Sequence, residues 1–231
     1  MTTVLLVRHG RTTANADGVL AGHTPGVRLD DTGVAQAAAL ADRLAGLRLA
    51  RVVSSPLERC RQTAEPLVQA AGLPVLTDDR LAEARYGDWT GRSLRELART
   101  SLWRTVQDHP SRAIFPGPDG ESMAAVAGRA VAAVRDHDRA VAADAGDAAV
   151  WAAVTHGDVI KAILADALGM HLDLFQRISV DPASVSVVRY TDRRPFVLRM
   201  NDSSTPLTAY SARRRRRRSS DAPVGGGAGQ S

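Results

Sequence analysis

The 231-residue sequence predicts an α/β fold, a three-layer sandwich in which helices cover both faces of a mostly parallel central sheet. Two observations predict this fold. Short runs that are wholly apolar, such as Val4–Val7, are typical of strands buried on both faces. These runs alternate with alanine-rich segments whose apolar residues recur at helical spacing, and this alternation favours a parallel sheet.

The first half of the chain predicts three strands and two helices. Helix Thr32–Leu47 follows two aspartates, which are good N-cap residues, and has Gly46 near its end. Helix Pro56–Ala71 ends at Gly72. The predicted strands are Val4–Val7, Arg51–Ser54 and Pro74–Leu76.

The second half continues the alternation and closes with a hairpin. Gly169 stops the last predicted helix, and residues 191–194 form the turn of the hairpin. The predicted elements are helix Glu121–Ala143, strand Val150–Thr155, helix Asp158–Leu168 and the hairpin strands Val185–Tyr190 and Phe196–Met200.

Two segments depart from this pattern. Residues 77–118 are irregular and predict a lid-like insertion with a helix over Ser93–Leu102. Residues 207–231 are rich in Ser, Arg and Gly and cannot bury enough apolar surface to fold. We therefore expect one domain over residues 1–206 and a disordered tail over residues 207–231.

The formal net charge of +5 lies in the tail, where Arg213–Arg218 form a continuous run. Residues 1–210 carry equal numbers of basic and acidic side chains, so the predicted domain is formally neutral. We therefore expect no nucleic-acid binding except through this run, which is equally typical of a solvated chain end.

Cysteine content and hydropathy suggest the compartment. The one cysteine, Cys60, cannot form an internal disulfide, which agrees with a reducing compartment, and its helical context suggests a packing residue. The chain has no apolar run of membrane-spanning length and no signal-peptide pattern. We expect a cytoplasmic protein that does not contact membranes.

Polar clusters follow three of the predicted strands. In an open parallel sheet the carboxyl ends of the strands share one edge, where ligands bind. We therefore expect two arginines and two histidines to meet there. The clusters are Arg8, His9 and Gly10; Ser54, Ser55 and Arg59; and Thr155, His156 and Gly157.

A phosphate dianion would fit such a cluster, because buried like charges repel unless an anion lies between them. The guanidinium groups of Arg8 and Arg59 can present paired donors to phosphate oxygens. Backbone amides around Gly10 and Gly157 supply further donors, and Asn15 supplies a neutral one.

Four motifs together resemble the histidine phosphatase superfamily, also called phosphoglycerate mutase-like. They occur in the order and spacing of that family, and the resemblance spans roughly residues 1–200. The chain also looks like an actinobacterial group labelled phosphomutase. The motifs are "RHGRTTAN" at 8–15, "SSPLERCRQTAEP" at 54–66, "EARYGDWTG" at 83–91 and "VTHGDVIKA" at 154–162.

The resemblance implies ping-pong phosphoryl transfer through a phosphohistidine. It implies that His9 attacks phosphorus through Nε2 while a backbone carbonyl holds the other ring nitrogen. Glu83 would protonate the leaving alcohol and then activate water. The phosphate-binding residues that it implies are Arg8, Asn15, Arg59, His156 and Gly157.

The chemistry suits these residue types. A neutral imidazole is a good nucleophile near pH 7, and arginines can stabilise charge on the equatorial oxygens. Glu83 must be protonated when substrate binds, so we expect a pH optimum below neutrality. Among nearby carboxylates, Asp78, Asp79 and Asp88 are the alternatives to Glu83, which the motif favours.

The phosphatase branch is the favoured interpretation. Mutases of this family place arginine and lysine where this chain has Ala84 and Leu94. A cofactor-dependent phosphoglycerate mutase or another phosphomutase is the first alternative, and a non-catalytic phosphate- or nucleic-acid-binding protein is the second. We expect a small phosphate ester as substrate, no cofactor, no metal and, as an open expectation, a homodimer.

Overall fold

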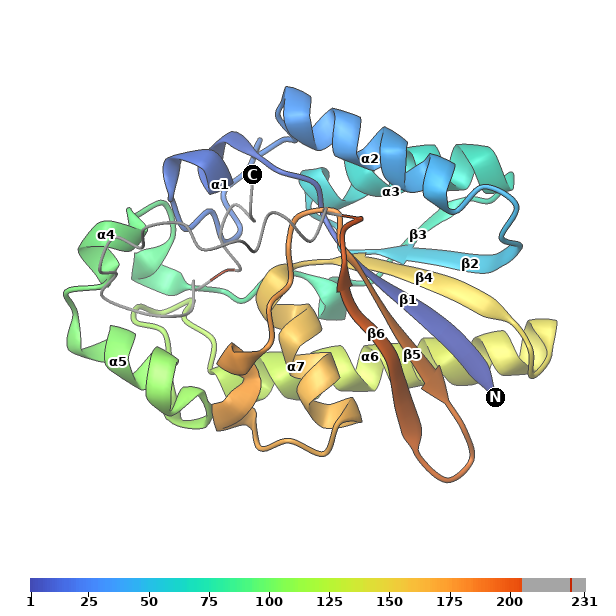
Figure 1. Cartoon of the computed structure of the whole chain (residues 1–231). Helices are drawn as coiled ribbons and strands as arrows, with labels where there is room; N and C mark the ends of the chain where they lie inside the picture. The colour runs from blue at the N-terminus through green and yellow to red at the C-terminus, as the bar shows by residue number, and fades with distance from the viewer. Residues whose placement is uncertain (205–224, 226–231) are drawn as a thin grey trace.

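The computed structural model describes residues 1–204 and Gly225. The Arg213–Arg218 run and the rest of the predicted tail, apart from Gly225, lie outside the described residues. Within the described part, helices lie on both faces of one central sheet (Figure 1). None of these helices is both long and apolar enough to cross a membrane.

The central sheet has six strands in the order β3-β2-β4-β1-β5-β6. The first four strands along the chain pair in parallel, and the last two add an antiparallel hairpin at one edge. The prediction of a mostly parallel sheet is confirmed. The strands are β1 (Thr2–Arg8), β2 (Leu49–Ser54), β3 (Val75–Thr77), β4 (Val150–Thr155), β5 (Val185–Tyr190) and β6 (Pro195–Asp202).

Two helix layers enclose the sheet, as the sequence predicts. One layer consists of α2 (Asp31–Arg43) and α3 (Glu58–Ala71), and the other of α6 (Met123–Ala145) and α7 (Gly157–Ala167) (Figure 1). Each layer packs its apolar side chains against one face of the sheet and forms its own hydrophobic core. The predicted three-layer sandwich is confirmed.

Strand β1 shows why its sequence is apolar at successive positions. Neighbouring side chains of a strand point to opposite faces of a sheet. Val4 and Leu6 belong to the larger core with α6 and α7, whereas Leu5 and Val7 belong to the smaller core with α2 and α3. Because both faces are covered, every position in the middle of the strand is buried.

The segment from residue 77 to residue 118 differs from its predicted helix content. The single helix expected over Ser93–Leu102 is wrong, because α4 (Leu94–Leu97) ends and α5 (Ser101–Asp108) begins within that range. The Thr100 hydroxyl caps α5 by accepting a hydrogen bond from the Trp103 amide. The segment also contains the short 3₁₀ turns Asp79–Leu81, Gly87–Trp89 and Pro110–Arg112.

The aromatic residues of this segment pack into the larger core of the domain. Tyr86, Trp89, Trp103 and Phe115 are all buried in the same cluster as Val4 of the central strand. The Tyr86 and Phe115 rings meet edge to face with centroids 4.8 Å apart. The segment is therefore anchored to the rest of the fold by its own side chains.

Two short helical elements follow from local capping that the sequence analysis did not detect. Helix α1 (Thr13–Asp17) begins with a capping box between Thr12 and Asn15 and ends at Gly18, which has a positive φ of 67°. A 3₁₀ helix at Leu172–Arg177 follows α7.

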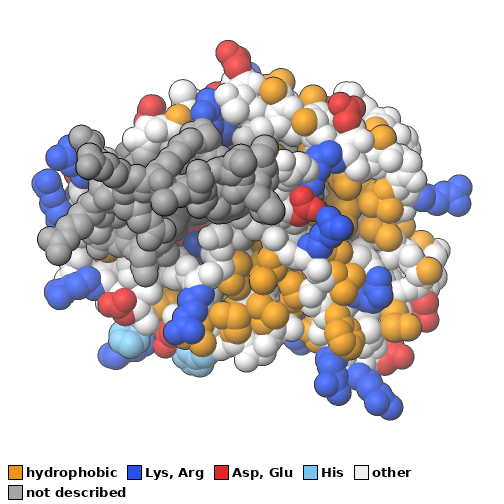
Figure 2. All heavy atoms as spheres, in the orientation of Figure 1, with side chains coloured by type: hydrophobic (Ala, Val, Ile, Leu, Met, Phe, Trp, Pro, Cys, Tyr) orange, Lys and Arg blue, Asp and Glu red, His pale blue; other side chains and the backbone are white. Residues whose placement is uncertain are grey.

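The outer strand β6 leaves apolar side chains exposed. Alternate residues Phe196, Leu198 and Met200 are each 45–50% exposed. Figure 2 shows hydrophobic side chains over the region that β5 and β6 occupy in Figure 1. The homodimer expected from the sequence stays a prediction.

Gly33 allows α2 to approach the loop that follows β1. A Cβ built on Gly33 would lie 2.0 Å from the Arg11 carbonyl oxygen, and one built on Gly10 would lie 2.7 Å from the Gly33 carbonyl oxygen. Both contacts are with backbone atoms, which cannot rotate away. This close approach requires glycine at both positions.

We predict that Gly33→Ala lowers the free energy of unfolding by roughly 2 kcal/mol, because the clash with backbone outweighs the better helix propensity of alanine. Gly128 is the matched control, because it lies exposed within α6 and a Cβ there would meet no atom within 4 Å. Gly128→Ala should raise the same free energy by about 1 kcal/mol. Urea denaturation measures both, and a stabilised Gly33→Ala protein would contradict the prediction.

Candidate active site

Parallel pairing of β1 with β4 brings the two histidines of the predicted site together. Arg8 pairs with Thr155 in the sheet, and the His9 amide donates a hydrogen bond to the Thr155 carbonyl at 2.9 Å. The residue that follows each strand is a histidine, His9 after β1 and His156 after β4. The centroids of the two rings lie 5.2 Å apart. The predicted convergence of these strand ends is present.

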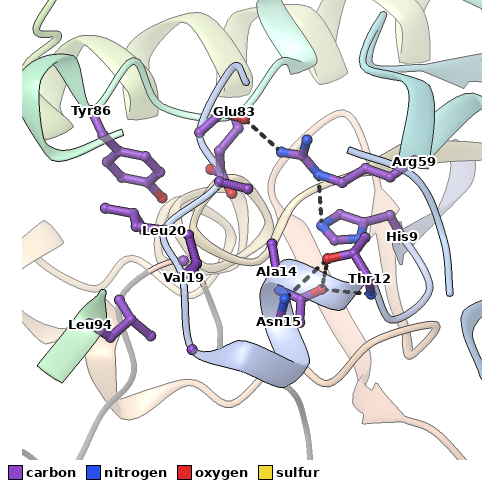
Figure 3. Close-up of a pocket in the computed structure, with 14 residues that line it drawn as sticks. His9, Thr12, Ala14, Asn15, Val19, Leu20, Arg59, Glu83, Tyr86 and Leu94 are labelled. Atoms are coloured by element: carbon purple, nitrogen blue, oxygen red, sulfur yellow. Dashed lines mark hydrogen bonds between the residues drawn. The ribbon is translucent and has the colours of Figure 1, made fainter. Parts of the chain in front are cut away.

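The first turn of α3 places Arg59 between the two rings. Its Nε lies 3.3 Å from His9 Nε2 (Figure 3). Its Nη2 lies 3.3 Å from His156 Nδ1. Nη2 also donates to the Gly22 carbonyl at 2.9 Å. Arg59 is only 3% exposed, so its side chain is fixed by these contacts.

The His9 ring is held in one tautomer. His9 Nδ1 lies 2.8 Å from the Gly10 carbonyl oxygen, which can only accept, so Nδ1 carries the proton. Burial, followed by the charges of Arg59 and Arg8, lowers the pKa of His9 well below its usual value. The ring is therefore neutral near pH 7, and Nε2 presents a lone pair beside Arg59.

His156 is also neutral and fully buried. Its Nδ1 accepts from the Arg59 guanidinium, so its Nε2 carries the proton and donates to Ser55 Oγ at 2.8 Å. Burial, with Arg59 as the next cause, lowers the pKa of this imidazole well below its usual value. Ser55 thus orients His156.

Arg8 lies fully buried behind the pocket. Its Nη1 donates to the Val180 carbonyl at 2.8 Å, and its Nη2 donates to the Gly225 carbonyl at 3.4 Å. Burial lowers the pKa of Arg8 to about 10, partly offset by the charge of Glu83, so the guanidinium stays charged at neutral pH. A fixed positive charge therefore lies directly beside His9 in sequence.

Glu83 is a buried carboxyl group on the same pocket. Its Oε1 accepts from the Ala84 amide at 3.0 Å, and its Oε2 lies 3.9 Å from His156 Nδ1. Burial and then the charge of Asp158 raise the pKa of Glu83 to about 7, while Arg59 opposes the rise. This carboxyl group can therefore both give and take a proton near neutrality.

One pocket connects these groups (Figure 3). Four of the predicted residues, His9, Asn15, Arg59 and Glu83, line it, whereas Arg8, His156 and Gly157 do not. Leucine and valine side chains form another part of the wall. The remaining lining residues are Thr12, Ala14, Gly18, Val19, Leu20, Ala21, Gly22, Tyr86, Leu94 and Gly225.

Asn15, one of the predicted phosphate-binding residues, forms hydrogen bonds with Thr12. Its side-chain oxygen accepts from the Thr12 amide at 3.1 Å and from the Thr12 hydroxyl at 2.9 Å. The carbonyl end of Asn15 is thus used to cap α1, and the amide NH₂ end is the part that can donate to a ligand. Thr12 was not predicted, although "TTAN" contains a capping pattern.

Gly157 is the first residue of α7 and follows the N-cap His156. Among the described residues no side chain caps this helix end, so its amides keep the donor character expected of a helix N-terminus. The structure places these amides one residue after the His156 ring, as the sequence predicts.

The alternatives to these residues have other contacts. Asp78 is bonded to Arg80 and His137, away from the pocket lining. Cys60 lies 3.4 Å from His156 Nε2, but burial raises the pKa of its thiol to about 12. The side chain is therefore a protonated packing residue at neutral pH.

One group beside the pocket, the carboxylate of Asp158, was missed by the sequence analysis. Tyr86 donates its hydroxyl to Asp158 at 3.1 Å, and Asp158 lies directly after the His156-Gly157 pair. The position of an acidic residue immediately after "THG" is the signal that could have identified it. In the part of the chain that the structure describes, no group of three His, Cys, Asp or Glu side chains is arranged to hold a metal ion.

Comparison with known proteins agrees with this geometry. The model of the histidine phosphatase superfamily (branch 1) matches residues 4–203. Phosphoserine phosphatase 1 of Hydrogenobacter thermophilus is 30% identical over 203 residues, covering 87% of this chain and 92% of the relative. A Yersinia pestis protein named probable phosphoglycerate mutase is 31% identical, covering 83% of this chain and 86% of the relative.

Solved structures show the same fold. YhfR of Bacillus stearothermophilus superposes with a TM-score of 0.77 at 27% identity, covering 87% of this chain and 98% of that one. A mycobacterial glucosyl-3-phosphoglycerate phosphatase superposes with a TM-score of 0.75 at 26% identity, with the same two coverages. The chain belongs to the histidine phosphatase superfamily, branch 1, and is an enzyme of the phosphatase or mutase type.

We predict that His9 stays neutral from pH 8 to well below pH 6.5, with its proton on Nδ1, because burial and two arginines disfavour the imidazolium. Nitrogen-15 NMR of the folded protein, with His9 assigned by comparison with His9→Gln, measures both properties. A histidine in an unfolded peptide of the same sequence is the control. A titration midpoint at or above 6.5 in the folded protein would contradict this account.

Proposed function

We propose that the protein is a phosphomonoester hydrolase that acts through a phosphohistidine on a small phosphorylated metabolite. The observation that carries the proposal is the neutral His9 ring, whose Nε2 lone pair lies 3.3 Å from Arg59 Nε in a pocket that Glu83 also lines. A nucleophile, a positive charge and a carboxyl group that can carry a proton are the three groups that the reaction requires.

In the first step His9 Nε2 attacks phosphorus, and the bond to the leaving oxygen breaks. The protonated Glu83 gives its proton to that oxygen, so the leaving group departs as an alcohol. In the second step the Glu83 carboxylate takes a proton from water, and the resulting hydroxide displaces His9 from phosphorus. Inorganic phosphate leaves, and both residues return to their starting protonation states.

Phosphate binding is supported by the charges around His9. We assign Arg8, Arg59, His156, Asn15 and the Gly157 amide to the phosphate oxygens. A bound dianion would oppose the lowering of the His156 pKa that burial and Arg59 cause, so this imidazole could then gain a proton and donate to phosphate. The guanidinium groups supply charge that persists throughout the cycle.

The phosphatase is favoured over the mutase by the pocket wall. Leu94 lines the pocket where the sequence comparison expects a lysine in mutases, and Ala84 is buried beside Glu83. Neither side chain can hold a second phosphate or a carboxylate by charge. The likeness to the Yersinia protein keeps phosphomutase as the alternative activity.

We also propose that residues 1–206 form the catalytic domain and that residues 77–118, which carry Glu83 and Tyr86, cover the pocket as a lid. We place the protein in the cytoplasm, acting without metal on a soluble phosphate ester, with a homodimer as its assembly. The buried single cysteine supports the reducing compartment.

We predict that His9→Ala lowers kcat/KM for p-nitrophenyl phosphate by at least about 10⁴-fold, because the nucleophile of the covalent step is lost. Incubation with ³²P-labelled substrate and rapid quenching at alkaline pH should trap label on the wild type and not on the variant. His109→Ala is the control, since that histidine side chain is 62% exposed and outside the pocket. Equal, negligible rates for wild type and His9→Ala would overturn the enzyme assignment.

We predict that kcat/KM falls as pH rises through about 7, where the carboxyl group of Glu83 loses its proton. The sign follows from the first step, which uses the protonated form.

Glu83→Gln should lower the rate with an alkyl phosphate by about 10²–10⁴-fold. The loss should be smaller with p-nitrophenyl phosphate, whose leaving group needs little protonation. A wild-type rate that keeps rising past pH 8 would contradict the assignment.

A further inference from the structure

A buried carboxylate beside the pocket has no role in the proposed reaction. Asp158 is the second residue of α7 and is 0% exposed. Its Oδ2 accepts from the Tyr86 hydroxyl at 3.1 Å and from the Gly225 amide at 2.9 Å. Its Oδ1 forms an ion pair with Lys161 Nζ at 3.6 Å.

Asp158 is not itself among the lining residues of the pocket, but Gly225, which lines it, fills the space beside the carboxylate. Gly225 lines the pocket, and its amide donates to Asp158 while its carbonyl accepts from Arg8. A group at this place therefore meets an acceptor on one side and a phosphate-binding arginine on the other. A donor attached to the leaving alcohol could occupy the same place when phosphate is at His9.

Tyr86 holds the carboxylate in position. The tyrosine ring is 1% exposed and packs edge to face on Phe115, so its hydroxyl is aimed at Asp158 by packing. Leu20 and Leu94 line the same pocket as Tyr86 (Figure 3). These apolar groups can contact the carbon skeleton of a small alcohol while the carboxylate takes a polar group.

Electrostatics indicates what that polar group is. A carboxylate close to a bound phosphate dianion is repelled by it and has lost its water, which is unfavourable unless donors compensate. Lys161 and Arg8 balance part of the charge. A hydrogen-bond donor on the substrate would satisfy the remaining acceptor capacity of the carboxylate.

We propose that Asp158 is a specificity-determining residue that accepts a hydrogen bond from an ammonium or hydroxyl group on the leaving alcohol. The preferred substrates are then small phosphate monoesters that carry a donor one or two carbons from the ester oxygen. This inference rests on the proposed phosphatase activity, and it names the substrate class of the same pocket.

Three matched esters test it: ethyl phosphate, 2-hydroxyethyl phosphate and O-phosphoethanolamine. They differ only in the group on the second carbon, which is hydrogen, hydroxyl or ammonium. For the full-length wild type we expect kcat/KM to be roughly 10- to 100-fold higher for the two donor-bearing esters than for ethyl phosphate, the range of one hydrogen bond to a charged group.

Two substitutions of Asp158 separate charge from hydrogen bonding. Asp158→Asn keeps the size and an acceptor but removes the charge, so the preference for the ammonium ester should fall about tenfold or more while that for the hydroxyl ester changes little. Asp158→Ala should abolish both preferences. Tyr86→Phe, which removes only the orienting hydroxyl, should reduce them in part.

The comparison is made as a ratio of two substrates within each variant, so a change in the folded fraction cancels. Asp166→Asn is the matched control, because Asp166 is on the same helix and pairs with exposed Arg135, away from the pocket. Its three-substrate ratios should equal those of the wild type.

Two results would overturn the inference while leaving the phosphatase activity in place. One is a wild type that hydrolyses the three esters with equal kcat/KM. The other is a donor preference that Asp158→Ala leaves unchanged. If the wild type hydrolyses none of the three esters faster than His9→Ala does, the proposed function fails and the inference fails with it.

Discussion

The parallel pairing of β1 with β4 is the constraint on which the site depends. The two strands bond along their whole length and end together, so the residues after Arg8 and Thr155 emerge side by side. Because both strands are buried on both faces, this register cannot shift without exposing one core and overfilling the other. Rigid strands thus place His9 and His156 with rings 5.2 Å apart, and neither side chain depends on a mobile loop.

Burial and nearby positive charge lower the pKa of both imidazoles at the strand ends. Arg8 stays charged while buried, and burial together with the charges of Arg59 and Arg8 holds the imidazoles of His9 and His156 neutral. Because the His9 imidazole is neutral, the arginines do not repel it, and its Nε2 keeps a lone pair. In the proposed reaction this lone pair makes His9 the nucleophile, and no separate base is needed to prepare it.

Two buried carboxyl groups, those of Glu83 and Asp158, lie near this cluster and have different surroundings. Burial and the charge of Asp158 raise the pKa of Glu83 to about 7. In the proposed reaction this carboxyl group can therefore carry a proton to the leaving oxygen. Asp158 itself accepts a hydrogen bond from Tyr86 and pairs with Lys161, and we propose that it also accepts one from the leaving alcohol. In the proposed function, one carboxyl group serves the reaction and the other selects the substrate, and their different surroundings set these roles.

The sequence by itself determined the sheet, its two helix layers and the chemistry of the strand ends, because these follow from local periodicity and from where polar residues interrupt apolar runs. It misjudged the segment around Leu94 and Trp103, where a threonine cap and core aromatics override helix propensity. Only the tertiary structure decided the tautomer of His9, the capping use of the Asn15 oxygen and the position of Asp158 beside Tyr86. These properties depend on burial and on contacts between residues distant in the chain, and no local pattern records either.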